Sequence, residues 1–273
     1  MAYRLLHVSD LHAGPPFSST IAEQLARQAR DLAPDLLVIS GDFVQRADIP
    51  AQWRTITAYL KTLPTPQLVV PGNHDVPLYN VFQRLFTPYR PYRRHISPDL
   101  NPVFTAPGLV VVGACSAHGL TLDGGRISAR QATALRTIFA RYGPEVCKVA
   151  AWHHPVVDSP DLHKRRAISA GPSAMGLLAS CGVDLLLCGH VHTGYVGQTS
   201  TFAPTLARDT IICQSGTSTS TRGYGPERGK NSFNLITINE QAIQISQQIY
   251  SPEAGAFVTA TERSFPRYTA LPA

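Results

Sequence analysis

Five short segments of the sequence carry clustered residues of the kinds that bind divalent metals. They supply carboxylates, imidazoles and one amide, which are the ligand types that suit zinc, manganese or iron. Six of the ten histidines lie within them. In chain order the segments are Asp10-Leu11-His12, Gly41-Asp42, Gly72-Asn73-His74-Asp75, His153-His154-Pro155 and Gly189-His190-Val191-His192. We therefore expect all five to contribute to one metal site.

Seven side chains in these segments are candidate ligands: Asp10, His12, Asp42, Asn73, His153, His190 and His192. Seven groups are too many for one tetrahedral ion but suit two ions that share a ligand. Two ions about 3.5–4 Å apart can polarise a phosphoryl oxygen, generate hydroxide and stabilise the leaving oxygen, so hydrolysis of phosphoesters is the favoured chemistry. A carboxylate is the natural bridge, and Asp42 is the central candidate. His74 is then free to contact phosphate or to protonate the leaving group.

The spacing of apolar residues predicts alternating strands and helices through the first two-thirds of the chain. The expected helices are 20–32, 51–63 and 128–142, the expected strands are 4–9, 36–40, 67–70, 146–152 and 183–188, and 103–106 with 109–114 predicts a hairpin. Each ligand segment follows a predicted strand, so the ligands would meet at the carboxyl ends of a buried sheet. If these segments are extended, Asp10 shares a face with His12, and His190 with His192.

Beyond His192 the pattern changes to alternating and β-branched runs without a long helix, at 211–214, 232–239 and 242–250. We expect these runs to form a second sheet packed on the first. The predicted fold is α/β, a four-layer α/β/β/α sandwich of two mixed sheets flanked by helices. Residues 1–250 would form one domain, and Pro252, Gly255 and Pro266 predict an irregular C-terminal segment over 251–273.

The composition is that of a soluble globular protein, with 44% hydrophobic and 15% charged residues. A net charge of +6 permits an anionic ligand such as phosphate without selecting one. The five cysteines form no CxxC pair, which favours reduced core residues in a cytoplasmic protein. The first residues are too mixed for a signal peptide, and no apolar run approaches the ~20 residues that span a bilayer.

Taken together, the five segments resemble the motif set of the calcineurin-like metallophosphoesterase superfamily: DxH, GDxx, GNH(D/E), an H-x-P segment and GHxH. The resemblance implies one metal held by Asp10, His12, Asp42 and His192, and a second held by Asp42, Asn73, His153 and His190. It also implies that His74 is the acid or the phosphate contact. The compact bacterial branch, similar to cyclic-nucleotide and glycerophosphodiester phosphodiesterases, fits best. The segments Ser215-Gly216-Thr217 and Asn231-Ser232-Phe233-Asn234 are part of that likeness.

The function that follows is a dinuclear metal-dependent phosphodiesterase acting on small phosphodiesters such as cyclic nucleotides, by attack of metal-bound hydroxide. The cofactors would be two divalent ions of manganese, iron or zinc. Alternatives on the same core are a nuclease, a nucleotide-sugar pyrophosphatase or a phosphomonoesterase, and, from another class, a non-catalytic scaffold. A scaffold would be expected to have lost ligands or His74, and none is lost. Nucleic acid is not the favoured partner, and the chain would be a monomer or homodimer.

Two positions within the motifs leave alternatives open. The H-x-P spacing favours His153 over His154 as the ligand, and His154 would then donate to a ligand or pack beside it. Asp75 would either orient His74 or close its own turn.

Two basic segments beside the motifs raise a choice between substrate binding and solvent exposure. Residues 79–95 interleave aromatic residues with arginines. This pattern is typical of a flap over the site that stacks a base, or of an amphipathic helix followed by a Pro-rich loop with solvated arginines. The second interpretation is favoured. In the loop 217–230, Arg222 is the better substrate contact because of its place after a late strand and its likeness to the family's segment. Residues 163–166 are expected to be a solvated charge run.

Overall fold

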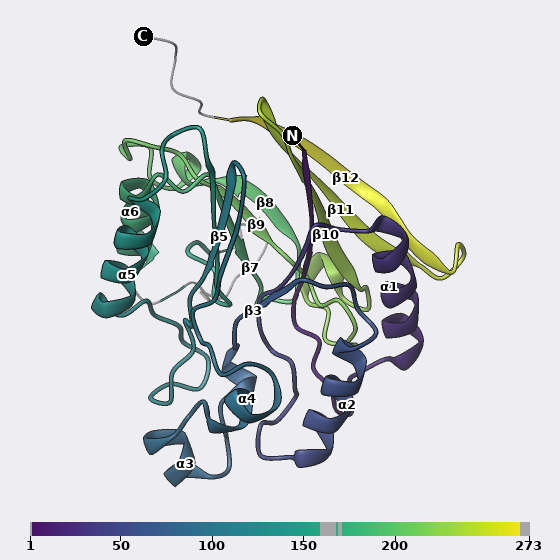
Figure 1. The fold of residues 1–273 in the computed structure, drawn as a ribbon. Coiled ribbons are helices and arrows are strands. Elements are labelled where there is room, and N and C mark those ends of the chain that lie inside the picture. The colour runs from purple at the N-terminus through teal and green to yellow at the C-terminus, as the bar shows by residue number, and fades with distance from the viewer. Residues whose placement is uncertain (1, 159–167, 169–170, 268–273) are drawn as a thin grey trace.

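Two six-stranded sheets pack face to face at the centre of the computed structural model, which describes residues 2–158, 168 and 171–267. Helices α1 and α2 lie on one side and α5 and α6 on the other (Figure 1). One apolar cluster, including Val38 and Val149, fills the space between the sheets. Two further clusters pack the outer faces of the sheets against the helices. The predicted four-layer α/β/β/α sandwich is confirmed.

The first sheet has the strand order β12-β11-β10-β1-β2-β3. Its strands are β1 (Tyr3–Val8), β2 (Leu36–Ile39), β3 (Gln67–Val69), β10 (Ser232–Ile238), β11 (Ala242–Ser251) and β12 (Ala256–Pro266). The second sheet has the order β4-β5-β6-β7-β9-β8. Its strands are β4 (Val103–Ala106), β5 (Leu109–Gly113), β6 (Cys147–Ala151), β7 (Leu185–Cys188), β8 (Tyr195–Gln198) and β9 (Ile211–Gln214). Strands β1–β3 run parallel, as do β5, β6, β7 and β9.

The late strands do not form a sheet of their own, so that part of the prediction is wrong. Strand β10 pairs antiparallel with β1, with Leu6 opposite Leu235, and β11 and β12 continue the first sheet. The second sheet begins instead with β4–β7 and is extended by β8 and β9. The physical reason is that β2 covers only one edge of β1, and the other edge needs a partner for its backbone groups.

The prediction of an irregular C-terminal segment is also corrected, for residues 251–267. Pro252 lies in a turn in which Gly255 has φ 59°, and the chain then folds back as β12. Strand β12 pairs with β11 from Ser251 opposite Ala256 to Ala242 opposite Pro266. Most of its side chains are exposed, so it lacks the apolar pattern that announces a buried strand.

Two of the long helices begin at capping serines. Helix α1 (Ser19–Leu32) is capped by Ser18, and α5 (Ala129–Phe139) by Ser128 in a reciprocal pair with Gln131. The remaining helices are α2 (Pro50–Leu60), α3 (Val81–Phe86), α4 (Arg90–His95), α6 (Gly171–Cys181) and the 3₁₀ turns Asn73–Asp75, Thr199–Thr201 and Gly225–Glu227. All five cysteines are buried free thiols, as predicted. The charge run 163–166 lies outside the described residues.

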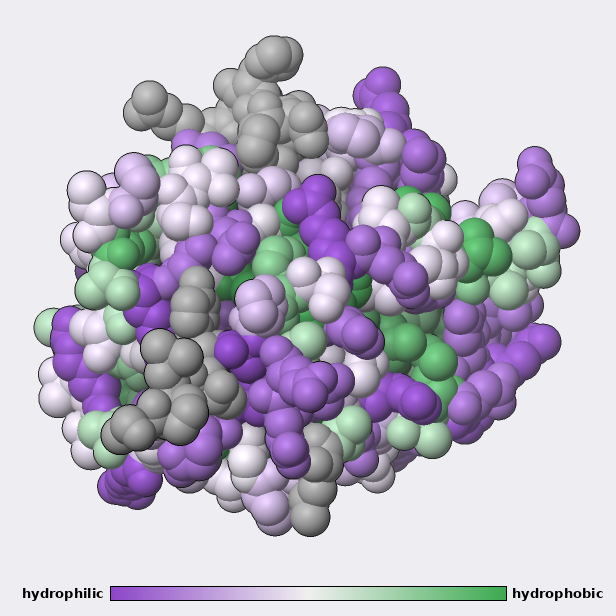
Figure 2. All heavy atoms as spheres, turned by 90° about the horizontal axis from the view of Figure 1, so that it is seen from above, coloured by the Kyte–Doolittle hydropathy of each residue, from purple (hydrophilic) through white to green (hydrophobic). Residues whose placement is uncertain are grey.

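None of the described helices is both long enough and apolar enough to cross a bilayer. Figure 2 shows the face that lies on top in Figure 1, where hydrophilic residues predominate around smaller hydrophobic areas.

Candidate metal centre

Loops that follow strands of both sheets meet at the carboxyl ends of β1, β2, β3, β6 and β7. The backbone of Asp10 donates to the Gly41 carbonyl at 3.0 Å, which joins the loops after β1 and β2. The backbone of Gly189 donates to the His153 carbonyl at 2.8 Å, which joins the loops after β6 and β7. A bond of 3.0 Å from the His190 backbone to Asp10 Oδ2 then links the two sheets. The predicted convergence of the five segments is therefore present.

The backbone is strained at most of the predicted ligands. In the described part of the chain, five of the six non-glycine residues with positive φ are predicted ligands: Asp10 (55°), His12 (49°), Asp42 (56°), His190 (75°) and His192 (61°). This left-handed conformation costs roughly 1–2 kcal/mol for an ordinary residue, and such strain gathers at functional sites.

The assumption that the DxH and GHxH segments are extended is therefore wrong. Asp10 and His12 still face a common cluster, but His190 and His192 face two different ones.

The first cluster contains Asp10, His12, Asp42 and His192, all buried. The Nε2 atoms of His12 and His192 lie 3.0 Å apart, and His192 Nε2 lies 3.1 Å from Asp10 Oδ1. His12 Nε2 is 3.6 Å from Asp42 Oδ2. Donor atoms about 2.1 Å from a tetrahedrally bound ion are separated by roughly 3.4 Å, so these spacings fit one coordination shell.

The second cluster brings together Asn73, His153 and His190. Asn73 Oδ1 lies 3.1 Å from His153 Nε2 and 3.0 Å from His190 Nδ1, and the two ring nitrogens are 3.3 Å apart. His153 Nε2 is 3.4 Å from Asp42 Oδ2. The donor set and the spacings again fit a divalent ion, with Asp42 facing both clusters.

Hydrogen bonds on the far side of these side chains orient their metal-ligating atoms toward the clusters. His153 Nδ1 can donate to the Ser40 carbonyl at 2.7 Å, and His192 Nδ1 to the Arg222 carbonyl at 3.0 Å. Asn73 Nδ2 donates to the Leu122 carbonyl at 3.1 Å, which leaves its oxygen toward His153. Partners of this kind fix the ring tautomer and orientation that a metal ligand needs.

His154 lies beside the second cluster, and a grouping of His153, His154 and His190 is also compatible with an ion. Its Nδ1 atom is 2.8 Å from Ser116 Oγ, and its ring is 4.5 Å from that of His190. Asn73 and Asp42 both face His153 rather than His154, so the choice of His153 as the ligand stays our prediction.

The protonation states of His12, His190 and Asp42 suit metal ligands, whereas His153 must lose a proton before it can bind an ion. Burial lowers the pKa of His12 and His190 to about 3, so both rings are neutral at pH 7. Burial raises the pKa of the Asp42 carboxyl, but His153 and the other facing histidines outweigh it and hold that pKa well below its usual range. Burial lowers the pKa of His153, yet Asp42 reverses the shift and raises it to about 9. A bound cation would compete with that proton.

His74 sits at the edge of the first cluster and not within either one. Its Nδ1 atom lies 2.8 Å from the Gln45 carbonyl, and its ring centre lies 4.8 Å from that of His12. Burial lowers the pKa of His74, Asp42 opposes the shift, and Arg222 and Arg46 add to it. Arg222 donates to Gln45 Oε1 at 2.8 Å, and the Gln45 carbonyl faces His74 Nδ1, so Arg222 lies beside His74. Its role as a substrate contact stays a prediction.

Two groups near the centre were missed by the sequence analysis. Arg46 Nη1 lies 3.0 Å from His74 Nδ1, and Asp123 Oδ1 lies 3.4 Å from His190 Nε2. Arg46 follows Asp42 by four residues, so its place in the GDxx loop could have drawn attention to it. Asp123 lies in a turn that no motif marks.

Asp75 closes its own turn and does more. Its Oδ2 accepts from the Gly72 backbone at 2.8 Å, and its Oδ1 accepts from the backbones of Phe43 and Val44 at 2.9 and 3.2 Å. It therefore ties the turn that carries Asn73 to the loop that carries Asp42.

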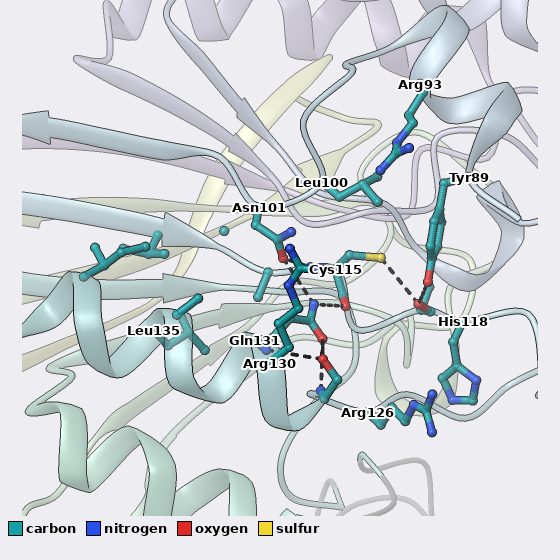
Figure 3. A pocket seen from close by; sticks show the side chains of 17 residues that line it. Tyr89, Arg93, Leu100, Asn101, Cys115, His118, Arg126, Arg130, Gln131 and Leu135 are labelled. Carbon is teal, nitrogen blue, oxygen red and sulfur yellow. Dashed lines mark hydrogen bonds between the residues drawn. The ribbon is translucent and has the colours of Figure 1, made fainter. Parts of the chain in front are cut away.

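A separate pocket of about 540 Å³ lies between α4, α5 and the end of β5 (Figure 3). Its walls include the ring of Tyr89, the apolar side chains of Leu100 and Leu135, and arginines at positions 93, 126 and 130. None of its lining residues is a predicted metal ligand.

The sequence matches the model of a known family, described as the calcineurin-like phosphoesterases, over residues 3–194. The chain belongs to the calcineurin-like phosphoesterase family. This range contains all five ligand segments.

Relatives and solved structures agree with that assignment. The UDP-2,3-diacylglucosamine pyrophosphatase LpxG of Chlamydia muridarum is 31% identical over 78 residues, which are 28% of this chain and 23% of that protein. A yellow lupin (Lupinus luteus) purple acid phosphatase superposes with a TM-score of 0.75 at 13% identity, covering 97% of this chain and 53% of that one. A dimetal phosphatase from Danio rerio gives 0.69 at 12% identity, covering 97% and 99%. At these identities the two structures establish the fold alone.

Proposed function

We propose that the protein is a dinuclear metal-dependent phosphodiesterase acting on small phosphodiesters, with cyclic nucleotides as the leading candidates. The observation that carries the proposal is the position of Asp42 Oδ2, which lies 3.6 Å from His12 Nε2 in one cluster and 3.4 Å from His153 Nε2 in the other. This oxygen receives no well-aligned hydrogen bond from the described residues, although it is buried. A buried carboxylate oxygen without a hydrogen-bond partner is costly, and coordination of both metal ions would supply the missing partners.

The residues of the two clusters would hold the ions, one in Asp10, His12, Asp42 and His192 and the other in Asp42, Asn73, His153 and His190. Bound there, manganese, iron or zinc would supply Lewis acidity toward the phosphoryl group and activate water for in-line attack. His74, held by the Gln45 carbonyl, would contact the phosphate or donate a proton to the leaving oxygen. Arg222 would bind a free phosphate oxygen.

A second candidate is hydrolysis of a nucleotide-linked pyrophosphate. It is favoured by the 78-residue match to the UDP-2,3-diacylglucosamine pyrophosphatase, whose substrate joins a nucleotide to an acylated sugar. The proposed ligand and His74 roles serve both reactions, because each breaks a phosphorus–oxygen bond of a doubly substituted phosphate. We place the protein in the cytoplasm, because its five buried free thiols suit a reducing compartment, and we propose a monomer or homodimer.

A substrate panel tests the proposal. Enzyme reconstituted separately with each metal is assayed on bis(p-nitrophenyl) phosphate, p-nitrophenyl phosphate, cyclic nucleotides and a UDP-linked sugar. We expect the diester to be cleaved with a higher kcat/KM than the monoester. A monoester preference would assign a phosphatase, and a strong preference for the UDP-linked sugar would assign the second candidate.

A further inference from the structure

Helix α3 exposes its apolar side chains and buries its charged one. Val81, Phe82, Leu85 and Phe86 are 61%, 74%, 51% and 68% exposed, whereas Arg84 is 7% exposed. A surface helix normally does the reverse. The amphipathic helix and Pro-rich loop predicted for 79–95 are therefore two short helices, α3 and α4, and the apolar face of α3 points to solvent.

Polar anchors hold α3 in this orientation. The Arg84 guanidinium donates to the carbonyls of Pro77, at 2.7 Å, and Thr121. The Asp48 carboxylate accepts from the backbones of residues 78, 79 and 80 just before the helix, and the Asn80 side chain caps it by accepting from the Gln83 backbone at 2.9 Å. The exposed side chains are thus fixed outward by the fold.

The apolar surface continues onto the neighbouring loop. Leu120 and Leu122 are 70% and 63% exposed, and the Arg84–Thr121 bond places this loop against α3. Of the twelve large hydrophobic residues exposed in the described structure, seven lie in α3, in the residues just before it and in this loop. We call this surface the α3 patch; it comprises Tyr79, Val81, Phe82, Leu85, Phe86, Leu120 and Leu122. Concentrated apolar surface of this kind marks an interaction site.

The α3 patch has a positively charged border. Arg90, Arg93 and Arg94 of α4 are exposed, and together with Phe86 and Tyr89 they line a hollow of about 680 Å³. The acidic residues nearest to the α3 patch are Asp48, which accepts from the backbone before α3, and Asp123, which faces His190; none occurs within 79–95 or 118–122. The partner of this surface must therefore combine an apolar layer with negative charge.

The α3 patch also borders the metal centre. The Leu122 carbonyl accepts a bond from Asn73, and the next residue, Asp123, lies 3.4 Å from His190. Figure 1 places α3 at the periphery of the molecule, away from the two sheets. A surface that docks here would lie next to the metal-binding loops.

We propose that the α3 patch docks the protein on an anionic phospholipid membrane. Phe82 and Phe86 insert at the boundary of headgroups and acyl chains, and the arginines of α4 contact lipid phosphates. A second copy of the chain fits less well, because symmetric pairing through the patch would bring arginines against arginines. The docking does not depend on the proposed reaction, but it would place the metal centre beside phosphoesters at a membrane surface.

Vesicle flotation tests the docking. Wild-type protein is mixed with vesicles of phosphatidylcholine alone or with about 30% phosphatidylglycerol. We expect binding to the anionic vesicles, weakened at least about tenfold in Phe82→Ser/Phe86→Ser. The matched control is Val258→Ser, which removes an apolar side chain that is 44% exposed outside the α3 patch. Arg90→Gln/Arg94→Gln, which leaves Arg93 in place, should reduce the preference for anionic vesicles.

Several results would overturn the proposal. The proposal fails if wild-type protein floats with neither kind of vesicle. It also fails if the Phe82→Ser/Phe86→Ser variant binds anionic vesicles as tightly as Val258→Ser does. A dimer in sedimentation velocity that this variant dissociates would assign the α3 patch to a second copy. Retained hydrolysis of bis(p-nitrophenyl) phosphate and an unchanged melting temperature show that the variants are folded. If no phosphoester is cleaved, the melting temperature alone serves, so vesicle binding is judged independently of the reaction.

Discussion

The Asp42 carboxylate accepts a hydrogen bond of 2.9 Å from the backbone N–H of His74 through Oδ1. This bond commits one oxygen to positioning the His74 turn and leaves Oδ2 to face both ligand clusters. The carboxylate that we propose as the bridge therefore also positions His74, the predicted acid or phosphate contact. A change at Asp42 should therefore affect both metal binding and hydrolysis, whereas a change at His74 should affect the chemical step alone.

Asp42→Ala should lower metal content below two ions per chain and remove nearly all hydrolysis. Both ions would lose a ligand, and the His74 backbone would lose its acceptor. Inductively coupled plasma mass spectrometry measures the metal, with Asp31→Ala on the exposed face of α1 as the control. Two ions retained in Asp42→Ala would rule out the bridge.

His74→Ala should retain two ions but reduce kcat by about 10²–10⁴, the usual contribution of general acid catalysis. The deficit should shrink for p-nitrophenolate esters, because that leaving group departs without a proton. Rates are compared for esters with good and poor leaving groups. Equal deficits on both would make His74 a phosphate-positioning residue, and loss of an ion would make it a ligand.

Arg222→Ala should raise KM for the diester by about tenfold, because a charge-assisted hydrogen bond contributes roughly 1.5–3 kcal/mol when it is fully formed. Arg222→Lys should recover part of that loss. Arg228→Ala is the control, since Arg228 lies in the same loop and is exposed. Steady-state kinetics that change equally in both alanine variants would remove Arg222 from substrate binding.

The sequence predicted the layered fold and the convergence of five loops, because each ligand segment follows an apolar strand whose carboxyl end faces the same edge. It did not predict the conformation of these loops. The positive φ of Asp10, His12 and His190 is enforced by bonds between loops far apart in the chain, which local patterns do not encode. The composition of each sheet was also missed, because pairing of β10 with β1 depends on tertiary contacts.

The outward-facing α3 was misjudged for a related reason. An apolar run with arginines predicts a buried face, and the bonds of Arg84 to the carbonyls of Pro77 and Thr121, together with those of Asp48 and Asn80, reverse it.

Asp75→Asn should lower the free energy of unfolding by about 1–3 kcal/mol, because an amide has one acceptor oxygen where the carboxylate serves three backbone N–H groups with two. Urea denaturation of the metal-free protein measures this loss, with Asp31→Asn as the control. A difference under about 0.5 kcal/mol would contradict the role of Asp75 in tying the two loops.

Anomalous diffraction from metal-loaded crystals shows directly whether two ions share Asp42. We predict two peaks about 3.5–4 Å apart, one among Asp10, His12, Asp42 and His192 and one among Asp42, Asn73, His153 and His190. A single peak, or a second peak bound by His154 in place of Asn73 and Asp42, would show that Asp42 does not bridge two ions.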